Sequence, residues 1–123
     1  MSEINWMQRI LIGKVGKDIT DPNFKNVRVD NQTPLGNPYV LNVQERTQEV
    51  VDLYASYLDK CINDHAPLPV VEKLEEIFEL LEEGYYVNLQ CFHPESPNHA
   101  ETIRDVLIEA LEGNEVIPKE LNL

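Results

Sequence analysis

The chain has 123 residues, of which 42% are apolar, enough to fill the core of one domain without disulfide bonds or metal ions. Ten Lys and Arg residues against 22 Asp and Glu residues give a net charge of −12 at pH 7. This charge repels nucleic-acid phosphates and anionic membranes, so it argues against both as partners, and it suits a basic partner. The simplest alternative is that the acidic surface only keeps a small protein soluble.

The cysteines and the hydropathy of the chain bear on its compartment. Cys61 and Cys91 are too few for a disulfide network, which favours a reducing environment. No apolar run approaches the roughly 18 residues of a membrane span. Residues 1–7 are polar and acidic, unlike a signal peptide. We therefore expect a cytoplasmic protein.

Strand and helix patterns alternate along the chain. Strands are predicted over residues 9–12, 27–29 and 85–91, and helices over about 43–63, 70–83 and 98–112. This alternation predicts an α/β domain, Rossmann-like and three-layered, with a small, mostly parallel sheet flanked by helices. We expect one domain over residues 1–123, with an N-terminal arm at 1–8, in which Trp6 packs onto the body, and a C-terminal tail at 114–123, docked through Val116 and Ile117.

Each predicted helix has end signals and an apolar face. Asn42 with Glu45, and Asn98 with Glu101, have the spacing of capping boxes, although Ser96 followed by Pro97 is a second possible start for the last helix. Gly84 suits the position just after the second helix. The expected core residues lie at helical spacing: Val50, Tyr54, Tyr57, Leu58 and Cys61; Val70, Leu74, Ile77, Phe78 and Leu81; Ile103, Val106, Leu107, Ala110 and Leu111.

Two loops each follow a predicted strand and precede a helix. The first, residues 33–38, is stiffened by two prolines and holds a glycine that lets a ligand come close. The second joins the last strand to the last helix through residues 91–101. In parallel sheets ligands bind beyond the carboxyl ends of the strands, so the two loops are expected at one polar or anionic ligand site. A rigid turn is the alternative for residues 33–38. Expected ligand contacts are Thr33, Leu35, Gly36, Asn37, Arg46, His93 and Asn98.

Three residues of the second loop carry chemistry of their own. Cys91, His93 and His99 are possible zinc ligands, but a fourth ligand and paired cysteines are missing, so we assign no metal. The alternative is covalent catalysis, with Cys91 as nucleophile near a helix N-terminus and His99 as acid or base. The third interpretation is a buried core thiol with hydrogen-bonding histidines. The residues do not name a cofactor.

These motifs resemble an uncharacterised family of phage and bacterial proteins, domain of unknown function four-three-two-six. Its members carry a TPLGNPF-like loop, a following arginine, and a C-W-C-x-P…C-H segment before the final helix. Here residues 33–38 match the loop, Arg46 the arginine, Cys91 the first cysteine and His99 the histidine. The resemblance covers about residues 25–112 and implies a pocket and a phage-type origin, with no settled activity.

The chain departs from the family pattern at four positions. Tyr39 stands for the usual phenylalanine of the loop, and Phe92 replaces the tryptophan. His93 and Asn98 stand where the family has its second and third cysteines. Histidine can still bind a metal, but asparagine is a poor ligand, which weakens any metal or thiol role implied by the resemblance.

The sequence thus leads to two functional hypotheses. In the first, the domain binds a small polar or anionic ligand, such as a nucleotide or sugar derivative, and processes it if it is an enzyme. In the second, it is a small acidic phage protein without chemistry that binds a basic host protein. Whether the protein is an enzyme is left open at this point.

Overall fold

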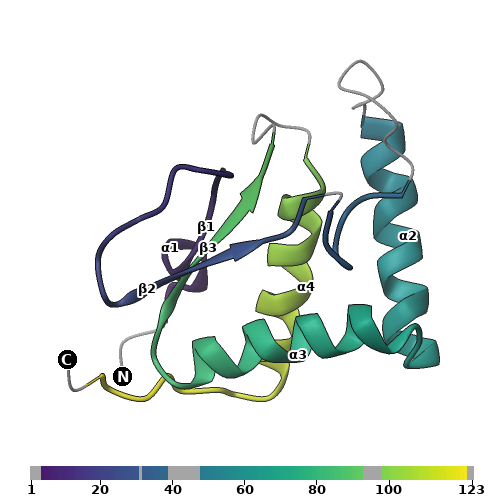
Figure 1. Cartoon of the computed structure of the whole chain (residues 1–123). Helices are drawn as coiled ribbons and strands as arrows, with labels where there is room; N and C mark the ends of the chain where they lie inside the picture. The colour runs from purple at the N-terminus through teal and green to yellow at the C-terminus, as the bar shows by residue number, and fades with distance from the viewer. Residues whose placement is uncertain (1–3, 31, 39–47, 93–97, 122–123) are drawn as a thin grey trace.

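The computed structural model describes residues 4–30, 32–38, 48–92 and 98–121. Three strands and four helices form a mixed α/β arrangement, in which the short helix α1 is additional to the three helices that the sequence predicts (Figure 1). In chain order the elements are α1 (Trp6–Arg9), β1 (Ile10–Lys14), β2 (Phe24–Arg28), α2 (Gln48–Asp64), α3 (Leu68–Glu82), β3 (Tyr86–Cys91) and α4 (His99–Gly113).

The sheet is parallel throughout and has the order β1-β3-β2. Ile10 pairs with Val87 on one side of β3, and Phe24 pairs with Tyr86 on the other. The central strand is buried along nearly its whole length, as is usual for a parallel strand between two neighbours. The predicted fold class is confirmed, and the arrangement is consistent with a small three-layer domain.

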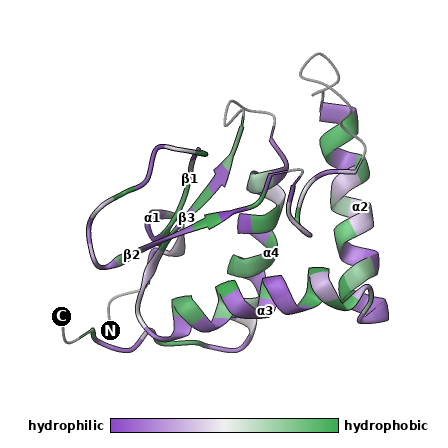
Figure 2. Cartoon of the chain, in the orientation of Figure 1, coloured by the Kyte–Doolittle hydropathy of each residue, from purple (hydrophilic) through white to green (hydrophobic). Residues whose placement is uncertain are grey.

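One face of the sheet is apolar and the other is polar. The apolar residues join one hydrophobic cluster with the helices, whose apolar sides are visible in Figure 2. On the polar face, Asn88 Nδ2 donates to Asn26 Oδ1 at 3.0 Å. Asn26 also bonds the backbone N–H and C=O of Ile19, and Gln90 Nε2 donates to Asp18 Oδ1 at 2.6 Å. The β1–β2 connection thereby satisfies buried amides that would otherwise destabilise the fold.

Gly13 lies within β1, and a turn follows the end of this strand. The turn itself is made by Val15 and Gly16, and Gly16 has a φ of +88°. A Cβ on Gly13 would lie 2.5 Å from Asn88 Oδ1, so glycine makes room there for the buried amide of the central strand. The spaced glycines therefore serve two different purposes.

Most of the predicted core is buried. The residues confirmed in full are Tyr54, Leu58, Cys61, Val70, Leu74, Ile77, Leu81, Ile103, Leu107 and Leu111. Three helices are rotated slightly from the expected faces: Val51, Val71 and Ala100 are buried in addition. Val50, Tyr57, Phe78, Val106 and Ala110 are only half-buried. None of the described helices is both long and apolar enough to cross a membrane.

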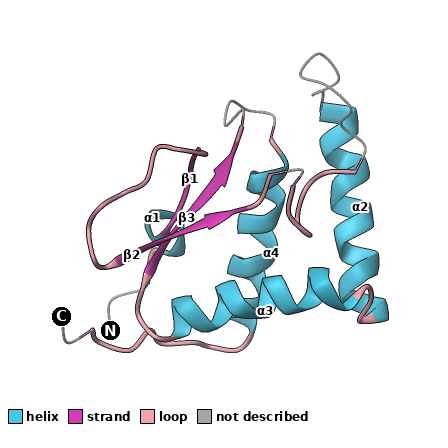
Figure 3. Cartoon of the chain, viewed as in Figure 1, coloured by secondary structure: helices cyan, strands magenta, loops and turns pink. Residues whose placement is uncertain are grey.

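Figure 3 shows where the described helices begin and end, and two of these starts bear on the prediction. Asn98 is the N-cap of α4 and forms the predicted capping box with Glu101, so Ser96 is not the cap. The second helix of the prediction starts earlier than expected, at Leu68, with Pro69 in its first turn. The predicted cap at Asn42 lies outside the described residues.

The described segments near the two chain ends depart from the prediction at two points. Trp6 is buried, but it lies in the short helix α1 rather than in an irregular arm. Val116 packs against the core, whereas Ile117 is 76% exposed, so its predicted docking is wrong. The tail instead passes close to Gly84, because the Lys119 N–H donates to the Glu82 carbonyl at 2.9 Å.

Gly84 is the position at which a single methyl group should disturb the fold most clearly. Its φ is +102°, and an added Cβ would overlap the Lys119 carbonyl oxygen. We expect Gly84→Ala to lower the free energy of unfolding by more than about 1 kcal/mol. Gly113→Ala is the matched control, because a Cβ there meets nothing within 4 Å, and it should change stability by less than about 0.5 kcal/mol. Equal urea denaturation midpoints for the two variants would contradict this account.

Candidate functional site

The two predicted loops begin at the same edge of the sheet. Because β2 and β3 are parallel neighbours, their carboxyl ends lie side by side. His99, the first residue of α4, has its Nε2 2.6 Å from the Val29 carbonyl oxygen just beyond β2. A carbonyl can only accept, so Nε2 carries the hydrogen and donates it. The structure therefore confirms that the segments following β2 and β3 meet.

The segment after β2 folds into two consecutive turns. The Thr33 N–H and Oγ1 both donate to the Asp30 carbonyl, at 2.9 and 2.8 Å. The Gly36 N–H then donates to the Thr33 carbonyl at 3.0 Å. Leu35 lies within the second turn and is fully buried, and Asn37 is also buried. Both side chains thus fix the shape of the loop from within, while Thr33 and Gly36 are half-buried.

Tyr54 of α2 holds this loop against the helices. Its hydroxyl donates to the Leu35 carbonyl at 2.7 Å, and its ring meets the His99 ring edge to face at 5.3 Å. Burial raises the pKa of Tyr54, with smaller contributions from Tyr57 and Cys61, so the hydroxyl keeps its hydrogen. Asn37 Nδ2 makes a longer contact of 3.5 Å with the Val50 carbonyl. One aromatic side chain therefore joins α2, the loop and α4.

Cys91 lies at the end of β3 and is 2% exposed. Asn98 Nδ2 donates to its Sγ at 3.3 Å, and Sγ is 3.7 Å from the Gly13 carbonyl oxygen. The Asn98 side-chain oxygen also accepts the Ala100 N–H at 2.7 Å. Cys91 and Asn98, two predicted site residues, are thus in direct contact. Their contacts join β1, β3 and the start of α4.

Arg28 and Asp30 were not predicted as site residues, although an Arg-x-Asp pair at the end of a strand was a readable signal. Arg28 Nε and Nη2 donate to the two Asp30 carboxylate oxygens at 2.8 and 2.7 Å. Asp30 is 1% exposed, whereas the Arg28 side chain is 43% exposed. Arg28 Cζ also lies 5.7 Å from the centre of the Phe92 ring, which is 41% exposed. A cation and an aromatic ring therefore face solvent at the same sheet edge.

The Arg28–Asp30 pair shifts both pKa values. Burial by itself would raise the pKa of Asp30, but the hydrogen bonds from Arg28 and from the Gln32 N–H outweigh it, and the pKa falls below its ordinary value. The hydrogen bond with Asp30 raises the pKa of Arg28. The pair is consequently ionised at neutral pH and holds the guanidinium in place.

Some predicted site residues lie outside the described part of the chain. Arg46 and His93 fall there, so their ligand contacts stay predictions. Among the described residues, no three His, Cys, Asp or Glu side chains are grouped closely enough to hold a metal ion. The described geometry therefore consists of the loop at 32–38, Tyr54, the Cys91–Asn98 contact, His99, and the Arg28–Asp30 pair with Phe92.

Comparison with protein families confirms the family that the sequence resembles. Residues 14–109 match the family described as Domain of unknown function (DUF4326), which is well over half of the chain. The chain belongs to this family. The match to DUF4326 begins at the last residue of β1 and ends within α4, so it spans both loops of the sheet edge. No curated protein and no solved structure matches the chain.

The Tyr54 hydroxyl gives a direct test of how the loop is held. Tyr54→Phe keeps the ring but leaves the Leu35 carbonyl without this donor, so the free energy of unfolding should fall by about 1–1.5 kcal/mol. Tyr85→Phe removes the same group from a half-buried ring and serves as the control, with an expected change below about 0.5 kcal/mol. Chemical denaturation followed by circular dichroism measures both. Equal stability of Tyr54→Phe and the parent protein would refute the anchoring role.

Asp30 should make stability depend on pH in a defined direction. Its pKa is lower in the folded protein than the ordinary 3.8, so its contribution is present above about pH 4 and is lost as the pH falls further. The stability difference between the parent and Asp30→Asn should therefore be constant near neutral pH and shrink below about pH 4. When Arg28 is also replaced by Gln, the stability difference caused by Asp30→Asn should depend less on pH. A difference that grows on acidification would contradict the assignment.

Proposed function

We propose that the protein binds a small anionic ligand with a planar part, such as a nucleotide, at the carboxyl edge of its sheet. The observation that carries this proposal is the pairing of Arg28 with Phe92, a guanidinium and an aromatic ring that are both exposed there. Guanidinium N–H groups donate charge-assisted hydrogen bonds to phosphate oxygens, and aromatic rings stack on bases. Together they offer the two contacts that a nucleotide needs.

The guanidinium is oriented before any ligand arrives. Asp30 accepts from Nε and Nη2, and Gln32 Oε1 accepts from Nη2 at 3.3 Å. Within the described part of the chain, Nη1 has no hydrogen-bond partner. A phosphate can approach this remaining side of the group without breaking the buried pair. An arginine that is already fixed loses less conformational entropy on binding, which favours affinity. Phe92 also stands at the family's aromatic position, which supports a shared role for that ring.

The loop at residues 32–38 packs at the same edge of the sheet. Tyr54 and His99 hold residues 32–38 against α2 and α4, and Asn98 holds the start of α4 on Cys91. We assign Leu35, Asn37, Asn98 and Cys91 to positioning the two segments, because all four are buried. Thr33 and Gly36, together with Arg46 and His93, are kept as ligand contacts in the proposal.

Catalysis is a separate question from binding. The described contacts of Cys91 and His99 oppose their predicted roles as nucleophile and as acid or base. Cys91 can attack a ligand only after its buried thiol is uncovered. His99 can act as acid or base only in competition with its bond to Val29. The proposal is therefore that the site binds a ligand. Chemical processing of that ligand would also require Cys91 to be uncovered or His99 to leave its bond to Val29. A phage-type origin and a cytoplasmic location belong to the same proposal, on the strength of the family resemblance and the composition.

Binding can be tested first by native mass spectrometry of freshly purified protein, compared with the denatured chain. We expect an added mass of nucleotide size, or saturable binding of a nucleoside mono- or diphosphate by titration calorimetry. Phe92→Ala should weaken this binding about tenfold, because stacking on one aromatic ring contributes about 1–3 kcal/mol. Arg28→Gln and His99→Ala should weaken it at least as strongly.

Matched controls separate the site from general charge and exposure. Lys17→Gln removes one positive charge from an exposed position, and Ile117→Ala truncates an exposed apolar side chain elsewhere. Neither should change affinity by more than about twofold, since isolated surface groups contribute little. Unchanged affinity in Phe92→Ala and Arg28→Gln would reject the site. A bare chain mass with no binding of any nucleotide tested would reject the ligand class.

A further inference from the structure

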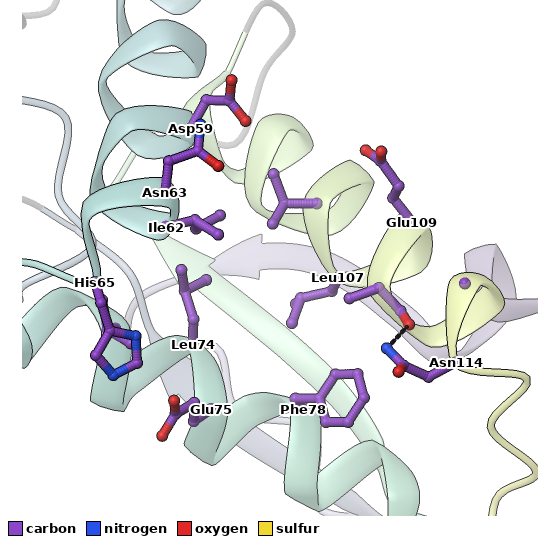
Figure 4. Close-up of a pocket in the computed structure, with 14 residues that line it drawn as sticks. Asp59, Ile62, Asn63, His65, Leu74, Glu75, Phe78, Leu107, Glu109 and Asn114 are labelled. Carbon is purple, nitrogen blue, oxygen red and sulfur yellow. Dashed lines mark hydrogen bonds between the residues drawn. The ribbon is translucent and has the colours of Figure 1, made fainter.

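A groove lies between α2, α3 and α4, formed by elements other than the sheet edge. It encloses about 630 Å³. Figure 4 shows Ile62, Leu74, Phe78 and Leu107 pointing into it from the three helices. Ile62 is 39% exposed, so part of its side chain is open to solvent in the groove. The groove therefore presents an apolar floor that the described part of the chain leaves open.

The rim of this groove is acidic on all three helices. Asp59 of α2, Glu75 of α3 and Glu109 of α4 line it, and its described lining includes no Lys or Arg. Within the described residues, none of these three carboxylates has an ion-pair partner. Like charges held around an apolar floor repel one another, and a partner of opposite charge would relieve that repulsion.

The acidic character continues along the seam between α2 and α4. A second groove of about 580 Å³ shares Asp59, Val106 and Glu109 with the first. Its lining adds Asp52, Glu101 and Asp105, again with no Lys or Arg among the described lining residues. Two of these have local roles, since Asp52 accepts from Gln48 and Glu101 caps α4. Carboxylates thus line the seam between α2 and α4 over several helical turns, from the second groove to the first.

We propose that this groove binds an amphipathic helix of a partner protein, with an apolar stripe flanked by Lys or Arg. Apolar anchors at helical spacing would occupy the floor beside Ile62 and Phe78, and the basic residues would lie against the acidic rim. A second copy of the chain fits poorly, because it carries the same net charge of −12. The proposal is independent of nucleotide binding at the sheet edge. It assigns a binding role to the acidic residues that line the groove.

The probe is a fluorescently labelled peptide of leucine and lysine, about 18 residues or about 27 Å long as a helix, with leucines on one face. A scrambled peptide of the same composition is the control for charge alone. By fluorescence anisotropy at about 50 mM salt, the amphipathic peptide should bind at least about tenfold more tightly than the scrambled one. Its affinity should fall as salt is raised. Equal affinity for both peptides, or no binding of either, would overturn the proposal.

Two double variants, each with two acidic residues replaced by lysine, test whether the peptide binds at the groove. Asp59→Lys/Glu109→Lys reverses the rim on α2 and α4 and should weaken the amphipathic peptide at least about tenfold. Asp64→Lys/Glu112→Lys makes the same charge change at exposed positions of the same helices and should cost less than about twofold. Ile62→Ser tests the floor and should also weaken binding. Circular dichroism confirms that each variant is folded.

Two results would assign the groove differently. Equal losses in the two charge-reversal pairs would mean that only the total charge matters, and the groove would no longer be the site. A dimer in size-exclusion chromatography with light scattering, broken by Asp59→Lys/Glu109→Lys, would assign the groove to a second copy of the chain. Either result would overturn the proposal and leave nucleotide binding at the sheet edge to be judged by its own variants.

Discussion

The parallel pairing of β3 with both of its neighbours is the constraint on which the rest of the structure depends. It gives the central strand two buried faces and brings all three carboxyl ends to one edge of the sheet. It also obliges the chain to satisfy polar side chains on the second face, which Asn26 does for Asn88. Gly13 is part of the same solution, because it leaves space for the Asn88 amide. The position of the site and the need for glycine at position 13 both follow from this pairing.

The loop at the sheet edge is held mainly by side chains that bond to backbone carbonyls. Tyr54 donates to Leu35, His99 to Val29, and Thr33 to Asp30. Buried carbonyls need such donors in a segment without strand partners. A polar loop can therefore lie against the hydrophobic core without lying in a sheet or helix. This arrangement gives the loop at residues 32–38 a structural role that is separate from any ligand contact.

The protein carries two surfaces of opposite chemical character. The sheet edge offers a guanidinium and an aromatic ring, which suit an anion with a planar part. The groove between α2, α3 and α4 offers an apolar floor with carboxylates, which suits a basic helix. The net charge of −12 agrees with the second surface and would hinder the approach of an anion to the first. The fixed Arg28 is therefore more important there than it would be on a neutral protein.

Periodicity and caps are local properties, so the sequence predicted the three strands, the three long helices, the α/β class, the Asn98 capping box and most of the core, but not the short helix α1. It also placed the two loops at one sheet edge. Only the tertiary structure decided that Val51 and Val71 are buried while Phe78 is half exposed, since the rotation of a helix depends on its neighbours. The same holds for Arg28 with Phe92 and for the groove of Asp59, Glu75 and Glu109, which join residues distant in sequence. Such groupings arise only when packing brings separate segments together.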